Sequence, residues 1–212
     1  MSEEWKFLQP VFNPEEVTKL REKLNKVVMG SGSTVDPSKL NIIKQADWIA
    51  IATESGDHFS EEDEIKLLQA VLENRNQEII AIGFEPVEPF PPAFVFPATA
   101  EAIEEFNWKC GLFWFTLYSG EPDWVIICTK LDFLVITGKH SFVKQFLGCK
   151  IQQALTDFYE LALSYPDYYP EKKSLLQVYN RLSREYPKIN TGEVIQLLPV
   201  SRNDINVLEM GL

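Results

Sequence analysis

Residues 108–147 read WKCGLFWFTLYSGEPDWVIICTKLDFLVITGKHSFVKQFL and carry the strongest β-strand signal of the chain. Three short runs within them, at 112–118, 124–129 and 133–137, are rich in aromatic and β-branched residues. Ser119–Asp123 contains a glycine and a proline, which favour a turn through their unusual backbone preferences. The runs are apolar on both strand faces, which is typical of a sheet that is covered on both sides. We therefore predict a three-strand antiparallel meander.

The flanking sequence predicts further strands and helices around this meander. Two more strands are expected at 48–52 and 78–84, both of which are short apolar runs. For 48–52, a helix is the alternative, because so short an apolar run does not distinguish the two. Capping residues and apolar periodicity predict helices at 14–28, 60–74, 99–106, 141–147, 151–164 and 172–186. The fold class is therefore α+β, with a central, mostly antiparallel sheet, flanking helices and a C-terminal helical pair at 150–187. At 212 residues, we expect the chain to form a single domain over 1–212.

Several segments have more particular expectations. For the helix at 60–74, the apolar spacing predicts a buried face made of Ile65, Leu68, Val71 and Leu72. Residues 85–97 contain five prolines, which predicts an extended connector lying along the domain surface, with its phenylalanines buried. A short helix over 36–43 and an edge strand over 193–198 complete the predicted elements.

The negative charge of the chain is concentrated in one segment. The formal net charge is −11, and residues 54–105 hold 13 acidic residues against 2 basic ones. The rest of the chain is balanced, so we expect a negative field around this acidic segment if it folds compactly. Such a field repels nucleic-acid phosphates and anionic membranes and attracts a basic protein or a cation. We therefore expect a basic protein partner, no nucleic acid and no membrane.

The cysteines and the N-terminal residues indicate where in the cell the protein is expected to be. Cys110, Cys128 and Cys149 lie in or beside apolar runs and have no metal-ligand spacing. Residues 1–7, MSEEWKF, lack the basic and apolar regions of a signal peptide, and no apolar run is long enough to span a membrane. We expect a soluble, cytoplasmic protein with reduced thiols and no cofactor.

The acidic run at the start of the 60–74 helix is the first candidate site. Carboxylates at a helix start interact favourably with the helix dipole, which is their ordinary role. The run lacks the alternating ligands and central glycine of a calcium loop, so no metal site is predicted. As a partner-binding surface, it would contribute Asp57, Glu61, Glu62, Asp63 and Glu64.

The second candidate is the junction between the third strand of the meander and the next helix. Strand-to-helix junctions often hold anions or catalytic groups, and this one contains Lys139, His140 and Ser141. The glycine pattern of a phosphate-binding loop is absent, because Phe133 occupies the first glycine position. The ordinary interpretation is an exposed loop with Ser141 as helix cap. A pocket for a small ligand or substrate at 138–141 is the alternative.

Two other groups of residues are assigned to the core. A nucleophilic pair of Cys128 or Cys149 with His140 is disfavoured, since Cys128 lies in an apolar strand and burial suppresses thiol reactivity. The aromatic residues near the meander are also expected to be mostly core, with one or two available to anchor a partner: Trp108, Phe113, Trp114, Phe115, Tyr118 and Trp124.

These observations favour a non-enzymatic interaction protein over an enzyme. The strand-turn-strand-helix pattern of 124–143, together with the acidity, resembles small bacterial immunity-type proteins. The resemblance covers under a fifth of the chain and transfers no site residues. It implies a protein that presents an acidic face to a basic partner, as inhibitors of cationic toxins do.

Overall fold

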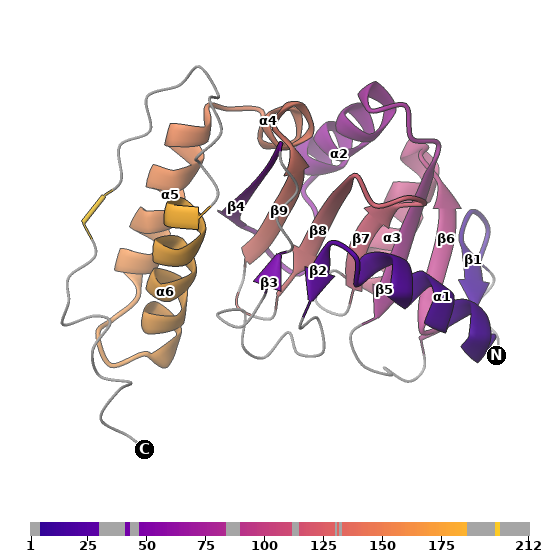
Figure 1. Ribbon diagram of the computed structural model, residues 1–212, viewed down its shortest axis with the longest axis horizontal. Helices are drawn as coiled ribbons and strands as arrows, with labels where there is room; N and C mark the ends of the chain where they lie inside the picture. The colour runs from indigo at the N-terminus through magenta and orange to yellow at the C-terminus, as the bar shows by residue number, and fades with distance from the viewer. Residues whose placement is uncertain are drawn as a thin grey trace.

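The computed structural model describes residues 5–29, 41–42, 47–83, 90–111, 115–129, 131, 133–185 and 198–199. These residues form an α+β fold in which helices flank a seven-stranded antiparallel sheet (Figure 1). In sheet order, its strands are β1 (Gln9–Val11), β6 (Ala93–Pro97), β5 (Glu78–Gly83), β7 (Phe115–Ser119), β8 (Trp124–Cys128), β9 (Phe133–Lys139) and β4 (Trp48–Glu54). A separate antiparallel pair consists of β2 (Val28–Met29) and β3 (Asn41–Ile42).

The predicted meander is the centre of the sheet. It consists of β7, β8 and β9, and all five residues of β8 are buried. Leu117 of β7 lies opposite Ile126 of β8, which in turn lies opposite Ile136 of β9. The strands expected at 48–52 and 78–84 are confirmed as β4 and β5, which pair with β9 and β7. Residues 112–114 of the first predicted strand lie outside the described residues.

Three of the helices begin where the capping residues Asn13, Ser60 and Thr99 predict. The amide N–H of Glu15 donates to the Asn13 side chain (2.9 Å) at the start of the first helix, and Thr99 accepts from Ala102 (3.3 Å) at the start of the third. The helices are α1 (Pro14–Leu24), α2 (Glu61–Glu73), α3 (Ala100–Cys110), α4 (His140–Leu147), α5 (Ile151–Ser164) and α6 (Pro170–Glu185).

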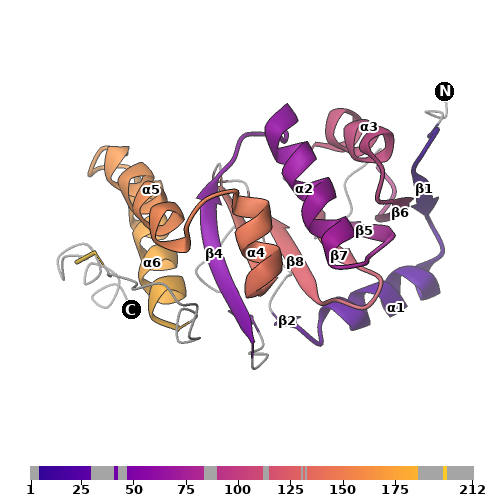
Figure 2. The same ribbon diagram turned by 90° about the horizontal axis from the view of Figure 1, so that it is seen from above.

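Helices cover both faces of the sheet. The ring of Phe115 in β7 lies 5.3 Å from that of Phe106 in α3, whereas the hydroxyl of Tyr118 donates to the carbonyl of Leu20 in α1 (2.8 Å). Phe115 and Tyr118 are three positions apart on one strand, so they point to opposite faces. Helix α3 therefore covers one face together with α2, and α1 covers the other (Figure 2).

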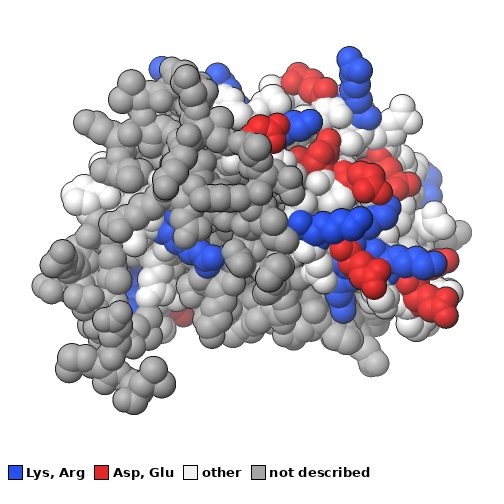
Figure 3. Space-filling view, viewed as in Figure 1, with Lys and Arg blue, Asp and Glu red and all other residues white. Residues whose placement is uncertain are grey.

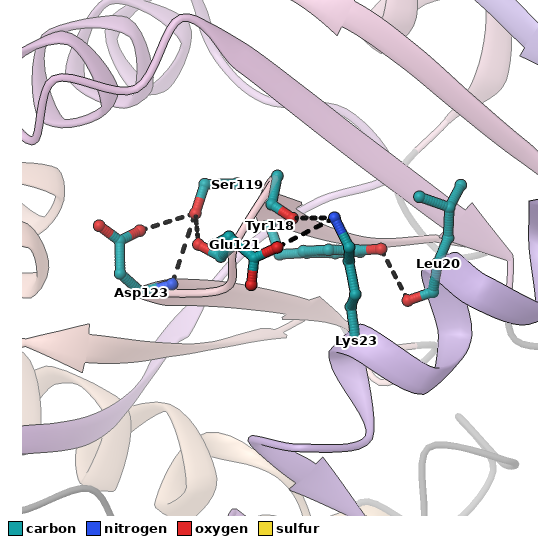
Figure 4. A network of polar contacts seen from close by, with 7 residues as sticks. Leu20, Lys23, Tyr118, Ser119, Glu121 and Asp123 are labelled. Carbon is teal, nitrogen blue, oxygen red and sulfur yellow. Dashed lines mark hydrogen bonds and ion pairs between the residues drawn. The ribbon is translucent and has the colours of Figure 1, made fainter.

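A polar network holds α1 against the turn between β7 and β8 (Figure 4). Lys23 of α1 donates to the carbonyl of Gly120 (3.0 Å) and forms an ion pair with Glu121 (3.1 Å). The hydroxyl of Ser119 lies within hydrogen-bond distance of the Glu121 carbonyl (2.6 Å) and of the Asp123 carboxylate (2.7 Å). The turn predicted at 119–123 is thus present, and its backbone provides the docking site for α1.

The predicted C-terminal helical pair is confirmed. Helices α5 and α6 pack against each other and against β4 at one end of the sheet (Figure 1). The ring of Phe158 in α5 lies 5.3 Å from that of Phe133 in β9. The inner face of α6 contains four buried apolar residues: Leu175, Leu176, Tyr179 and Leu182.

The proline-rich segment differs from its expectation. Residues 93–97, expected as part of a connector, form β6, which pairs with β1 on one side and β5 on the other. Four of the five prolines precede the strand, and Pro97 is its last residue, so the ladder loses few amide donors. Phe94 and Phe96 are buried, as predicted for the aromatic residues of this segment. Residues 85–89 lie outside the described residues.

Three smaller elements differ from their predictions or fall on residues that the structure does not describe. The first helix ends at Leu24, and Val28 belongs to β2, because the chain turns after Leu24 to place this valine in the core. Asn41 and Ile42, expected in a short helix over 36–43, form β3, and the other residues of that helix are not described. Residues 193–197 of the predicted edge strand are likewise outside the described residues.

Candidate functional site

A groove between α2 and α3 contains residues of both helices. It has a volume of about 390 Å³, and we call it the α2–α3 groove. The lining residues of α2 are three or four positions apart, and those of α3 are four positions apart. Each helix therefore contributes one stripe of its surface. The residues that line the groove are Phe59, Glu61, Glu64, Ile65, Leu68, Ala100, Glu104 and Trp108.

Asn107 fixes the base of the groove. This side chain is fully buried, and its amide oxygen accepts from the backbone N–H of Phe59 (2.7 Å). Its amide nitrogen donates to the carbonyl of Phe59 (2.9 Å) and to the carboxylate of Glu64 (2.5 Å). One α3 residue therefore holds both the loop before α2 and a groove carboxylate of α2 in place. The Phe59 ring, itself buried, packs 6.3 Å from the ring of Phe146 in α4.

The carboxylates of the groove repel one another. Burial raises the pKa of Glu64 above its ordinary value of 4.5, and the nearby Glu104 and Glu61 carboxylates raise this pKa further. The hydrogen bond from Asn107 opposes this rise by stabilising the ionised form. Within the described part of the chain, none of the ion pairs involves Glu61, Glu64 or Glu104.

Neighbouring carboxylates on the same two helices are neutralised by lysines. Glu62 pairs with Lys66 four residues later on α2 (2.7 Å), and Glu105 pairs with Lys109 on α3 (2.8 Å). Glu61, Glu64 and Glu104, which line the groove, have no such lysine partner among the described residues. These three carboxylates all belong to the acidic segment 54–105.

Apolar side chains are also exposed at the groove. Trp108 is 67% exposed and Ile65 is 51% exposed. The indole of Trp108 stacks against the ring of His58, with centroids 5.3 Å apart and planes inclined by 27°. Together with the carboxylates, these side chains give the groove a surface that is both apolar and negatively charged.

The structure divides the five acidic residues predicted to bind a partner. Glu61 and Glu64 line the α2–α3 groove. Glu62 pairs with Lys66, and Asp63 forms a capping box with Ser60, whose backbone N–H and hydroxyl both donate to its carboxylate. Asp57 is exposed in the loop before α2 and does not line the groove.

The prediction for the inner face of α2 is partly wrong. Leu67, Ala70 and Val71 are buried against the rest of the fold, whereas Ile65 and Leu72 are exposed. The helix has two apolar stripes. The stripe with Leu67, Ala70 and Val71 packs closely against the core because the side chain of Ala70 is small. The other stripe, with Ile65 and Leu68, lines the groove.

Sequence reasoning assigned Trp108 to the mostly buried aromatic group and did not select Glu104 or Asn107. The sequence does contain a signal for Trp108 and Glu104. Ala100, Glu104 and Trp108 recur at intervals of four and therefore share one face of α3, opposite its buried face with Ile103 and Phe106. No local signal identifies Asn107, because its partners are 43 and 48 residues away in the sequence.

The second predicted site lies at the junction of β9 and α4. Lys139 is the last residue of β9, and α4 begins at the next residue, so no loop separates the two elements. Ser141 is exposed and is not the cap, since Lys139 occupies that position without a side-chain hydrogen bond. Within the described residues, the buried Nε2 of His140 has no hydrogen-bond partner.

Gly138, beside these residues, has a packing role. Its φ is +152°, and an added Cβ would lie 2.9 Å from the Cβ of Trp124 and 3.0 Å from its Cα. The Trp124 indole stacks on the ring of Phe142 in α4, with centroids 4.7 Å apart, and donates to the Asn76 side chain (2.9 Å). The glycine is therefore explained by the close approach of β8 and β9.

The other candidate chemistries find little support in the described residues. Burial raises the pKa of the Cys128 thiol far above its ordinary value, which suppresses formation of a reactive thiolate. In the part of the chain that the structure describes, no three His, Cys, Asp or Glu side chains form a metal-binding group. Among the same residues, no helix has the length and hydropathy needed to cross a membrane.

Comparisons of the chain with protein-family models, with curated proteins and with solved structures give no match. Any functional proposal therefore rests on the residues of the chain itself.

Proposed function

We propose that the protein is a non-enzymatic interaction module that binds a basic protein partner in the α2–α3 groove. The observation that carries this proposal is the set of three carboxylates without ion-pair partners among the described residues, Glu61, Glu64 and Glu104, around an exposed tryptophan. A basic partner would supply the positive charge that the groove lacks.

Electrostatics supports a cationic partner. Like charges gathered in one groove destabilise the folded chain. The pKa of Glu64 is raised mainly by burial, and the nearby Glu104 and Glu61 carboxylates add to this rise. A partner that brings opposite charge removes this repulsion on binding, and it is also attracted from a distance. Both effects increase affinity and association rate for basic partners over acidic ones.

Apolar contact supports a protein partner. Trp108 and Ile65 present exposed apolar surface beside the carboxylates, and tryptophan is among the residues that most often dominate binding energy at protein interfaces. A simple cation would leave this surface uncovered. A protein segment that carries both apolar and basic side chains would cover it.

The acidic excess is not spread evenly over the molecule. On the face that carries α1, acidic and basic side chains are intermixed over the described residues (Figure 3). Helix α1 itself has Glu15 and Glu16 in its first turn and Arg21 and Lys23 in its last. This face is therefore a poor match for a strongly basic partner, which favours the α2–α3 groove.

In the cell, such a module would act as an inhibitor or immunity-type protein that masks a cationic surface of its partner. We propose that it acts in the cytoplasm, where its three cysteines would stay reduced. Two of the three are buried, as expected for structural thiols.

The test uses a variant that neutralises the groove without changing its shape. The triple variant Glu61→Gln, Glu64→Gln, Glu104→Gln should lose a partner that wild type captures from native lysate at low salt. Raising the salt concentration should weaken capture by wild type, because salt screens exposed charges. Each captured protein is identified by mass spectrometry, and its binding is then measured with purified material.

A matched control separates local charge from net charge. Glu22→Gln, Glu73→Gln, Glu160→Gln removes the same charge at exposed positions of α1, α2 and α5 outside the groove. This control should bind as wild type does. If both triple variants lose the partner equally, or if the captured protein is acidic, the proposal is wrong.

A second candidate function concerns the junction of β9 and α4. The buried Nε2 of His140, without a partner among the described residues, favours a small-ligand or enzyme site formed by Lys139, His140 and Ser141. In that case, the variant Lys139→Ala, His140→Ala should abolish phosphate binding detected by ³¹P NMR line broadening. Equal line broadening with wild type and variant, or none with either, would remove this candidate.

A further inference from the structure

Trp108 lines the α2–α3 groove and is 67% exposed. Its indole stacks against the ring of His58, which is not among the lining residues. An indole is the aromatic ring that attracts cations most strongly over its face. The position of Trp108 therefore suits a positively charged group that enters between the two helices.

Carboxylates approach this position from both helices. Glu64 and Glu61 belong to α2, and Glu104 lies one turn before Trp108 on α3. Asn107 holds one oxygen of Glu64 by a hydrogen bond of 2.5 Å, so this carboxylate has a defined orientation before any ligand arrives. A preoriented acceptor lowers the entropy cost of binding.

We infer that the α2–α3 groove recognises an arginine side chain of the basic partner. This inference rests on the proposed function and adds the chemistry of recognition. A guanidinium stacks flat on an indole and donates two parallel hydrogen bonds to a carboxylate, whereas the ammonium of lysine is a compact, strongly hydrated charge. Arginine therefore fits the ring and the carboxylates together better than lysine does.

The groove is large enough for an arginine side chain. Its volume of about 390 Å³ lies at the lower end of the range of about 300 to 1,000 Å³ that small-molecule sites occupy. Ala100 contributes the smallest side chain of the lining and leaves space beside Glu104. The variant Ala100→Leu should therefore obstruct the groove without any change of charge.

The experiment uses the full chain labelled with ¹⁵N and the peptide Ac-Gly-Arg-Gly-NH₂ as probe. The indole N–H signal of Trp108 is assigned by its absence from the spectrum of Trp108→Phe. We expect the arginine peptide to shift this signal saturably. The peptide with citrulline, which has the same shape and no charge, should shift it little, and the lysine peptide should bind several-fold more weakly than the arginine peptide.

Variants test the residues one group at a time. Glu64→Gln with Glu104→Gln should weaken binding of the arginine peptide roughly tenfold, because two charge-assisted contacts are lost. Glu22→Gln with Glu73→Gln is the matched control and should leave binding unchanged. Trp108→Phe, followed on the amide of Ile65, should weaken binding while leaving the carboxylates in place.

Three results would overturn the inference. Equal shifts with arginine and citrulline would show that charge does not matter, and no shift with any peptide would exclude an arginine site. Equal affinity for arginine and lysine would disprove arginine selectivity. The proposed function is tested separately, by the lysate experiment with the triple variants. A negative result with the arginine peptide therefore leaves the proposed function to that experiment.

Discussion

Glu64 lies where its negative charge lowers the stability of the folded protein. Because its pKa is raised in the fold, the folded state holds the proton of this carboxyl more tightly than the unfolded chain does. Stability therefore falls as the pH rises from the ordinary value of 4.5 through the raised value, and the loss is complete above it. A side chain that reduces stability at neutral pH needs another reason to be there.

We predict opposite effects of Glu64→Gln on stability and on binding. The glutamine oxygen still accepts from Asn107, so the variant should be more stable at neutral pH, by less than about 1 kcal/mol because water screens the repulsion. Below the ordinary pKa of glutamate, the two proteins should unfold at the same urea concentration. Binding of the arginine peptide should nevertheless weaken, as is common where function conflicts with stability.

This prediction is checked by urea unfolding at neutral and acidic pH, together with the NMR titration. A variant that is less stable than wild type at neutral pH would show that Glu64 has a structural role instead.

Asn107 is the residue on which the shape of the groove depends most. We predict that Asn107→Asp lowers the free energy of unfolding by roughly 3–5 kcal/mol at neutral pH, because it buries an unpaired negative charge beside Glu64. The variant also loses the donors to Phe59 and Glu64. The deficit should shrink in acid, where the new carboxyl is protonated, and thermal unfolding at two pH values measures this. A deficit that is the same at both pH values would contradict this account.

At the scale of elements, helix α2 has one apolar face that packs in the core and another that is exposed. Leu67, Ala70 and Val71 form the stripe that packs in the core, while Ile65 and Leu72 are each 51% exposed. Ile65 and Leu72 are seven residues apart, so they share one face of the helix about 10 Å apart along its axis. A partner that extends beyond the groove would reach this second apolar side chain.

We predict that substitutions on the two stripes have distinct effects. Leu67→Ala should reduce the free energy of unfolding by about 2–5 kcal/mol, since it creates a cavity in the core. Ile65→Ser and Leu72→Ser should each change it by about 1 kcal/mol or less, because about half of each side chain is already in water. Urea unfolding gives both values. The same two serine variants should weaken capture of the basic partner, and a large loss of stability in either would contradict the exposed position of its side chain.

At the scale of the whole molecule, the two ends of the sheet are protected differently. One end is β1, which has three residues and contains Pro10, so it offers few backbone groups to another strand. The other end is β4, a seven-residue strand against which α5 and α6 pack. The helical pair thus covers the edge that would otherwise promote aggregation.

We predict that Phe158→Ala loosens this cover. The ring of Phe158 is buried 5.3 Å from the ring of Phe133, and its loss should reduce the free energy of unfolding by about 3–5 kcal/mol. Amide hydrogens of β4 and α5 should exchange faster, while those of β5 and β6 keep their relative protection, as measured by hydrogen exchange and mass spectrometry. Uniformly faster exchange over all strands would show that the helical pair and the sheet unfold together.

The sequence alone was sufficient for the local architecture. The meander, the strands β4 and β5, the capped starts of α1, α2 and α3, and the C-terminal pair follow from alternation, capping and periodicity, which act over a few residues. The acidic character of one segment is also a property of composition, and so is the expectation of a basic partner. The number of prolines in 85–97 predicts a connector, but residues 93–97 form a strand because four of the five prolines precede it and Pro97 is its last residue.

Only the tertiary structure decides which acidic and apolar residues form the groove. Helix α2 carries two apolar stripes, and the packing of Ala70 and Val71 in the core leaves Ile65 exposed. Glu64 and Glu104 are distant in the sequence and become neighbours because Asn107 joins α3 to the loop before α2. Pattern and charge count are local properties, whereas a groove depends on contacts between residues far apart in the chain.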